Sequence, residues 1–167
     1  MLKPTPPGWP RISQSIYYED PHAAIDWLCA AFGFELVLKV EGDQGEVVHS
    51  ELRFGEGLIM VGGSERDAAS HHAHEKDNKE GEQDKEAWRG LQKSPKALAG
   101  VNTQSACVFV DDVDAHCERA RAHGGVVVRE PITSDYGEEY WSDRAYGVCD
   151  LEGHLWWFMQ RMRTGKG

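Results

Sequence analysis

Three polar side chains alternate along one short segment and have the residue types for acid-base chemistry. His49, Glu51 and Arg53 are separated by single residues in the run VVHSELRF. Because successive side chains of a β-strand point to opposite faces, a strand here places all three on one face. The imidazole could then act as a general base that the carboxylate orients. An equally simple interpretation is an exposed polar face on which Glu51 neighbours Arg53.

Aromatic side chains offer a different chemistry, the non-covalent binding of a small molecule. Trp156 and Trp157 are adjacent, so on a strand one packs under a helix and the other projects from the opposite face. A projecting indole can stack on a planar or cationic compound, or it can fill a cleft and leave no pocket. Tyr17 and Trp141 are further candidates. Arg144 could orient an anionic group or lock a turn.

The first half of the chain predicts one strand, one helix and three further strands. Asp20 can cap a helix whose apolar positions recur at three- and four-residue spacing, and Gly33 ends it. Gly-bearing turns separate the strands that follow. The expected elements are a strand at 11–18, a helix at 22–32, and strands at 34–40, 46–54 and 58–61.

The same order recurs in the second half, so the chain contains an internal repeat. Asp112 corresponds to Asp20, and Ser105 to Ser13, each at an offset of 92 residues. The expected elements are a strand at 104–110, a helix at 113–122, and strands at 126–129, 140–149 and 155–160. The fold class is therefore α+β, built from two β-α-β-β-β modules.

The predicted boundaries divide the chain into four parts. Residues 1–10, rich in proline, form an N-terminal arm, residues 11–63 the first module and residues 101–163 the second. Residues 64–100 are dense in His, Glu, Lys, Asp and Gly without a sustained apolar period. We expect this segment to be a mobile linker that is dispensable for folding, because it cannot bury enough apolar surface to offset its ordering entropy.

Composition restricts the partners and the compartment. The net charge of −10 opposes binding to nucleic acid, and no apolar run is long enough to span a membrane. The four cysteines are widely spaced and form no C-x-x-C pair, which is typical of free thiols in a reducing compartment. We expect a cytoplasmic protein.

One segment carries a family resemblance. Asp150 to Trp156, DLEGHLW, resembles the turn before the last strand in the vicinal oxygen chelate superfamily, which includes glyoxalase I, bleomycin-resistance proteins and extradiol dioxygenases. The stretches HSELRFG, YGE and DR resemble a metal-poor branch of it. The resemblance implies U-shaped sheets that pair around a cleft, with metal ligands on the first and last strand of each module.

The positions that hold those ligands in catalytic members hold other residues here. They are Ser13 and Met60 in the first module and Ser105 and Trp157 in the second. Hydroxyl, thioether and indole groups cannot supply the imidazole and carboxylate donors that such a site requires. We therefore expect neither metal nor cofactor.

Three hypotheses about function follow. The first hypothesis is a metal-independent protein that binds or sequesters a small molecule. The candidate ligand-binding residues are Tyr17, Trp141, Arg144, Trp157, Met60 and Ser105. The alternative is a lyase, isomerase or dioxygenase-type enzyme with His49 and Glu51 as catalytic candidates. A third possibility is a scaffold whose cleft the indole plugs. A homodimer is expected, with the modules paired within one chain or between two.

Overall fold

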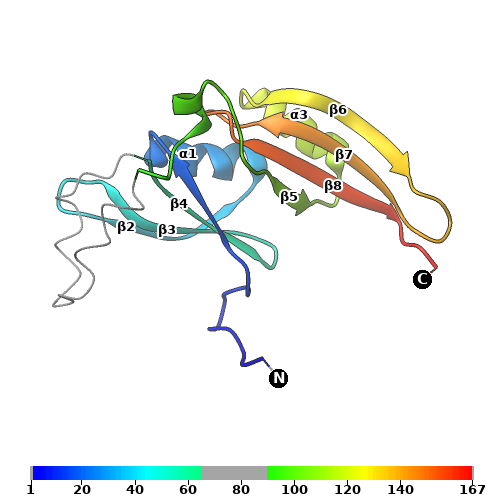
Figure 1. The fold of residues 1–167 in the computed structure, drawn as a ribbon, viewed down its shortest axis with the longest axis horizontal. Coiled ribbons are helices and arrows are strands. Elements are labelled where there is room, and N and C mark those ends of the chain that lie inside the picture. Colours follow the sequence, from blue (N-terminus) through cyan, green and yellow to red (C-terminus); the bar gives the residue numbers. More distant parts are fainter. Residues whose placement is uncertain (1, 65–89, 167) are drawn as a thin grey trace.

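The computed structural model describes residues 2–64 and 90–166 and contains two four-stranded sheets. The first module forms the sheet of order β1-β4-β3-β2 (Figure 1). Its helix α1 runs directly into a π-helical turn, η1. The elements are β1 (Gln14–Tyr18), α1 (Pro21–Trp27), η1 (Leu28–Phe32), β2 (Glu35–Glu41), β3 (Val47–Phe54) and β4 (Gly57–Gly63).

The second module repeats this arrangement with the sheet order β5-β8-β7-β6. In each module the first strand is parallel to the last, and the other strand pairs are antiparallel. The predicted pair of β-α-β-β-β modules is confirmed. The elements are β5 (Ala106–Phe109), α3 (Val113–Ala122), β6 (Val126–Asp135), β7 (Ser142–Cys149) and β8 (Leu155–Arg163).

The predicted helix caps form in both modules. Asp20 Oδ1 accepts a hydrogen bond from the amide of Ala23, and Asp112 Oδ1 accepts one from the amide of Ala115, each at 3.0 Å. Gly33 ends the first helix with φ of +82°, a left-handed conformation that favours glycine. The repeat in the sequence therefore corresponds to two equivalent helix N-caps in the structure.

The pairing of the strands shows the internal repeat independently of the helix caps. Ser15 of β1 pairs with Met60 of β4, and Cys107 of β5 pairs with Trp157 of β8. Ser15 and Cys107 are themselves equivalent, at the same offset as the two caps. Met60 and Trp157 therefore occupy corresponding positions on the last strands of the two modules.

The strand that most exceeds its predicted length is β6. β6 extends to Asp135 rather than ending at Arg129, and its pairing with β7 shifts register between Arg129 and Ile132. Pro131, which lies within this irregularity, cannot donate to a ladder, but a proline is tolerated at a bulge in an edge strand. The proline interrupts the pattern in the sequence without ending the strand.

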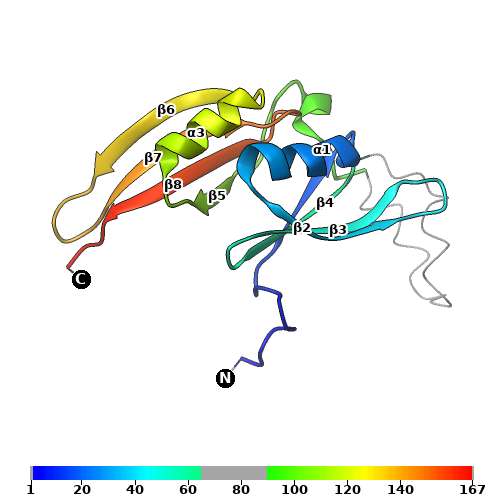
Figure 2. The ribbon, with the colours of Figure 1, turned by 180° about the vertical axis from the view of Figure 1, so that it is seen from behind.

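Both helices lie on the same side of the molecule, where the two modules share one core (Figures 1 and 2). Phe32 of η1 packs against Trp156 and Phe158 of β8, with ring centroids 5.4 and 4.7 Å apart. His116 of α3 is buried among the same rings. The two sheets lie side by side (Figures 1 and 2).

Polar contacts hold the modules together at their junction. The Glu152 carboxylate, which is buried, accepts hydrogen bonds from the amides of Glu19 and Asp20 at 2.8 and 2.9 Å. His154 Nε2 hydrogen-bonds the Tyr17 carbonyl at 3.0 Å. Arg119 of α3 donates from Nη2 to the Phe32 carbonyl at 2.7 Å. The DLEGHLW turn thus joins the two modules, and His154 binds a backbone carbonyl there.

The end of the expected linker belongs to this junction. Ser94 is buried and its hydroxyl donates to Glu152, while Pro95–Leu98 form a short 3-10 helix, η2. The expectation of a mobile segment therefore does not extend to residues 94–98, and residues 65–89 lie outside the described residues. Those residues include the histidines at 71, 72 and 74.

Among the residues described, no helix has the length and apolar character needed to cross a bilayer.

Candidate functional site

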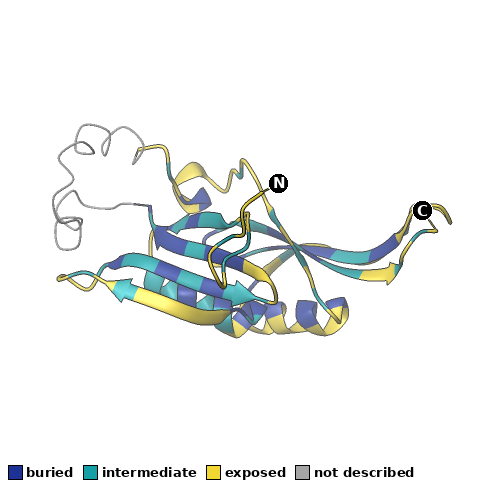
Figure 3. Ribbon diagram, turned by 90° about the horizontal axis from the view of Figure 1, so that it is seen from below, coloured by how far each residue is buried: buried dark blue, intermediate teal, exposed yellow. Residues whose placement is uncertain are grey.

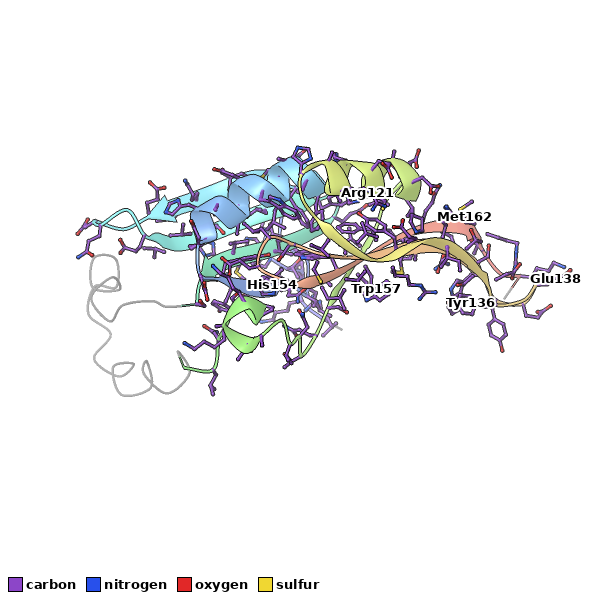
Figure 4. The ribbon with its side chains drawn as sticks, turned by 90° about the horizontal axis from the view of Figure 1, so that it is seen from above. Arg121, Tyr136, Glu138, His154, Trp157 and Met162 are labelled. Atoms are coloured by element: carbon purple, nitrogen blue, oxygen red, sulfur yellow. The ribbon has the colours of Figure 1, made fainter. Side chains whose placement is uncertain are left out.

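Each sheet has a face that points away from the helices, and the last strand of the second module shows the division clearly. Trp156 and Phe158 of β8 are buried against the helices, with exposures of 1% and 0%. Trp157 and Met159 alternate with them and are partly exposed on the opposite face. Figure 4 shows Trp157 and Tyr136 on this side of the sheet, away from α3. We call it the open face of the second module.

A hollow of about 360 Å³ lies on this open face. Strands β5, β6, β7 and β8 all contribute to it, and its wall is aromatic and aliphatic with a few polar groups. Residues lining it include Trp157, Met159, Cys107, Ile132, Tyr136 and Asp143. Ser105, predicted from its family position, also lines it.

The Trp157 indole is held between a glycine and an arginine. A Cβ built on Gly147 of β7 would lie 3.1 Å from the Trp157 ring, so the absence of a side chain there lets the ring lie close to β7. The guanidinium of Arg129, on β6, lies 5.7 Å from the ring centroid. This distance is within the range of a cation–π contact.

A second arginine, Arg161 near the end of β8, lies beside Asp143, which lines the hollow. The Arg161 guanidinium lies 5.4 Å from the ring centroids of both Phe109 and Trp141. Its Nε donates a hydrogen bond to Asp143, which is only 9% exposed. Trp141, a predicted binding residue, is therefore beside this face and is 41% exposed.

The open face of the first module carries the predicted polar residues. Ser50 and Leu52 of β3 are buried towards the helices, so His49, Glu51 and Arg53 share the other face, as alternation predicts. His49 Nε2 lies 3.0 Å from Glu51 Oε1. The pair has the geometry of a base and its orienting carboxylate, and a catalytic role for it stays a prediction.

Arg144 requires a correction. It lies on the helix side of β7, where its guanidinium makes two hydrogen bonds to the Asp114 carboxylate of α3, at 2.7 and 2.8 Å. The Asp114 pKa is lowered by this hydrogen-bonded partner. Arg144 therefore ties a helix to the sheet and cannot reach the hollow. On the open face, Arg161 lies in the position that was expected of Arg144.

Tyr17 is also separated from Trp157. It lines a smaller cavity of about 200 Å³ at the module junction, with Gln14, Asn102 and His154. Ser105 borders this cavity as well as the hollow. The structure thus places Trp157 and Ser105 at the hollow and Trp141 against Tyr136, a residue that lines it, but Tyr17 lies elsewhere.

Sequence reasoning missed several residues of the open face. Met159 and Arg161 are two and four residues after Trp157 on β8, so the alternation of a strand could have predicted that both share its face. Tyr136 had no such signal, because the irregularity at Pro131 hides the continuation of β6. Arg129 ends the strand expected at 126–129, but nothing in the sequence places it beside Trp157. Gly147 is seen only from the packing of the Trp157 ring against it.

The residues at the four family ligand positions do not fit a metal. Met60 is half-buried, Ser13 has a buried hydroxyl without a hydrogen-bond partner, and Trp157 faces a guanidinium. With Ser105 as the fourth, the set offers no imidazole or carboxylate donor. Within residues 2–64 and 90–166, no group of three His, Cys, Asp or Glu side chains is placed to hold an ion.

Comparison with known proteins places the chain in a family. The model of the Glyoxalase/Bleomycin resistance protein/Dioxygenase superfamily matches residues 11–158. The chain belongs to this superfamily. An uncharacterised protein of Mycobacterium bovis is 25% identical over 154 residues, which cover 92% of this chain and 85% of that protein.

Solved structures share the fold. TioX from Micromonospora sp. ML1 superposes with a TM-score of 0.61 at 27% identity, over 92% of this chain and 100% of that chain. The antibiotic-binding protein TnmS3 from Streptomyces sp. CB03234 gives a TM-score of 0.56 at 16% identity, over 89% of this chain and 93% of that chain. At that identity the second likeness shows the fold alone.

Proposed function

We propose that the protein binds a planar small molecule non-covalently, without a metal, on the open face of the second module. The observation that supports this most directly is the Trp157 indole, which lies in a hollow on the side of the sheet away from the core. Aromatic rings with an exposed face stack favourably on planar ligands. The antibiotic-binding neighbour agrees with this class of function, although it does not identify a ligand.

We further propose that a second copy of the chain completes the site. The open faces carry large apolar side chains that are substantially exposed in one chain, among them Phe109 at 53%, Ile132 at 50% and Leu38 at 42%. Strand β2 is exposed along most of its length (Figure 3). Exposed apolar surface of this kind typically marks an interface. In a homodimer, the first module of one chain would cover the second module of the other.

Fluorescence titration tests the binding proposal. A panel of planar aromatic compounds is titrated against the protein, and hits are repeated with Trp157→Leu, which keeps apolar volume but removes the stacking surface. Affinity should fall by about 1–3 kcal/mol. Trp27→Phe is the control, because Trp27 packs on Phe32 at the core and should report nothing of the ligand. Unchanged affinity in Trp157→Leu would overturn the proposal.

Sedimentation tests the assembly. A homodimer should have twice the 18.7 kDa mass of one chain. A charge placed on the proposed interface, as in Ile132→Asp, should shift the protein towards the monomer. A wild-type protein that stays monomeric at high concentration would contradict the two-chain site while leaving binding to a single face open to test.

A second candidate function rests on the His49–Glu51 hydrogen bond. In the proposed dimer this pair would face the hollow of the other chain, where it could move a proton on a bound compound. His49→Gln should then abolish turnover of a compound while leaving its binding unchanged. Equal consumption of the compound by wild type and His49→Gln would leave binding as the function.

A further inference from the structure

We infer that the ligand is a planar aromatic compound that carries an anionic group, and that Arg129 and Arg161 select it. This inference deepens the proposed function and rests on it. It runs against the charge of the whole chain, which is −10 and by itself would favour cationic compounds. The charges on the open face of the second module, rather than the net charge, determine whether an anionic or a cationic ligand is preferred.

Arg129 has the position of a ligand-binding group. It is exposed, lies 5.7 Å from the Trp157 ring centroid, and makes no ion pair or hydrogen bond with any residue that the structure describes. Other arginines of this module have acidic partners: Arg121 pairs with Glu130 at 2.9 Å and Arg163 with Asp135 at 2.6 Å. A guanidinium beside an indole, with its donors unused, can hold an anionic substituent of a stacked ring.

Arg161 adds a second group of donors beside Asp143, a residue that lines the hollow. Its Nε donates to Asp143, and its plane is flanked by Phe109 and Trp141. These contacts fix the guanidinium while leaving its two terminal nitrogens without a described partner. Arg129 and Asp143 are the charged residues that line the hollow, and Arg161 neutralises this aspartate, so Arg129 contributes a positive charge that no lining carboxylate offsets. Because Asp143 is committed to Arg161, a cationic ligand would meet Arg129 without a free carboxylate to offset it.

A matched pair of probes separates charge from stacking. Anilinonaphthalene sulfonate is planar, aromatic and anionic, and phenylnaphthylamine has the same ring system without the sulfonate. The wild-type protein should bind the sulfonate about five- to tenfold more tightly, the scale of one charge-assisted contact at a partly exposed site. Raising the salt concentration should weaken sulfonate binding and leave the uncharged probe unaffected.

Arginine variants then locate the effect. Arg129→Gln and Arg161→Gln should each remove most of the preference for the sulfonate, with little change for phenylnaphthylamine. Arg144→Gln is the matched control, since Arg144 lies on the helix side of β7 and should leave both affinities unchanged. Thermal unfolding of each variant confirms that the protein is folded in the titration.

The outcomes distinguish this inference from the proposed function. If both probes bind with equal affinity, in a manner that depends on Trp157, the site exists and the anion selectivity is wrong. A preference that persists in Arg129→Gln and Arg161→Gln also overturns the inference. If neither probe depends on Trp157, the proposed site itself fails.

Discussion

The Tyr18 hydroxyl donates a hydrogen bond to Asp150 Oδ2 at 2.6 Å and thereby joins the first strand of one module to the turn before the last strand of the other. Both residues are buried, and Trp156 Nε1 donates to the same oxygen at 3.0 Å. Burial, together with the charge of Asp150, raises the pKa of Tyr18 well above its usual value, so the hydroxyl remains a donor.

Removing this hydroxyl should destabilise the whole molecule. Tyr18→Phe leaves a buried carboxylate short of one donor, which typically costs about 1–3 kcal/mol in the free energy of unfolding. Denaturant unfolding measures the loss. Tyr17→Phe is the control, because the Tyr17 hydroxyl makes no hydrogen bond with a described residue. Equal stability of Tyr18→Phe and Tyr17→Phe would show that the contact contributes nothing.

Gly147→Ala should weaken ligand binding by displacing the indole. The added methyl would lie 3.1 Å from the Trp157 ring and 3.3 Å from Val128, so the ring must move by a few tenths of an ångström. We expect a stability cost of about 1 kcal/mol and a several-fold loss of affinity for a stacked probe. Gly90→Ala is the control, since a Cβ there meets nothing within 4 Å. Affinity equal to wild type in Gly147→Ala would contradict the close fit.

Acidification should destabilise the protein through His116. Its Nε2 donates to the Phe32 carbonyl, so Nδ1 accepts from the Tyr146 hydroxyl, at 3.0 and 2.6 Å. Burial lowers the His116 pKa from 6.5 to about 4. Between these values the unfolded chain binds more protons than the folded protein, so stability falls as the pH decreases through this window.

The expected loss from His116 is about 2 kcal/mol between about pH 7 and pH 5. Unfolding measured across this range in wild type and His116→Gln should show a shallower slope in the variant, whatever its absolute stability. His123→Gln, at an exposed histidine, should keep the wild-type slope. If His116→Gln retains the full slope, other groups carry the acid sensitivity.

Chelators should leave both unfolding and probe binding unchanged, because the family ligand positions hold Ser13, Met60, Ser105 and Trp157. Elemental analysis of the purified protein gives a direct measurement. One divalent ion per chain would contradict the expectation. His49→Ala and Glu51→Ala would then be the first variants to examine for its loss.

Local signals in the sequence were sufficient to predict the two modules and their elements. The caps at Asp20 and Asp112 and the alternation at Trp156 and Trp157 each depend on a few neighbouring residues, so the elements and their faces could be predicted. The face of Arg144 could not be predicted reliably, because it depends on the parity of β7 relative to a core that only packing defines.

Long-range contacts decided the rest. The side-by-side arrangement of the sheets depends on contacts such as Glu152 with the amide of Glu19, 133 residues away, which no local pattern reveals. The hollow itself depends on Gly147 and on the irregular continuation of β6 past Pro131. These features arise from tertiary packing around short-range elements, where intrinsic propensity carries little information.

The common core beneath the two helices constrains how such a repeat can arise. Phe32 is completely buried with β8 of the other module packed against it, and Trp156 of that strand is buried at the same contact. A lone module with this helix face would expose those rings to water, at an unfavourable free energy for each aromatic side chain. It would need a second copy to cover them. Joining two such modules in one chain makes their association independent of concentration.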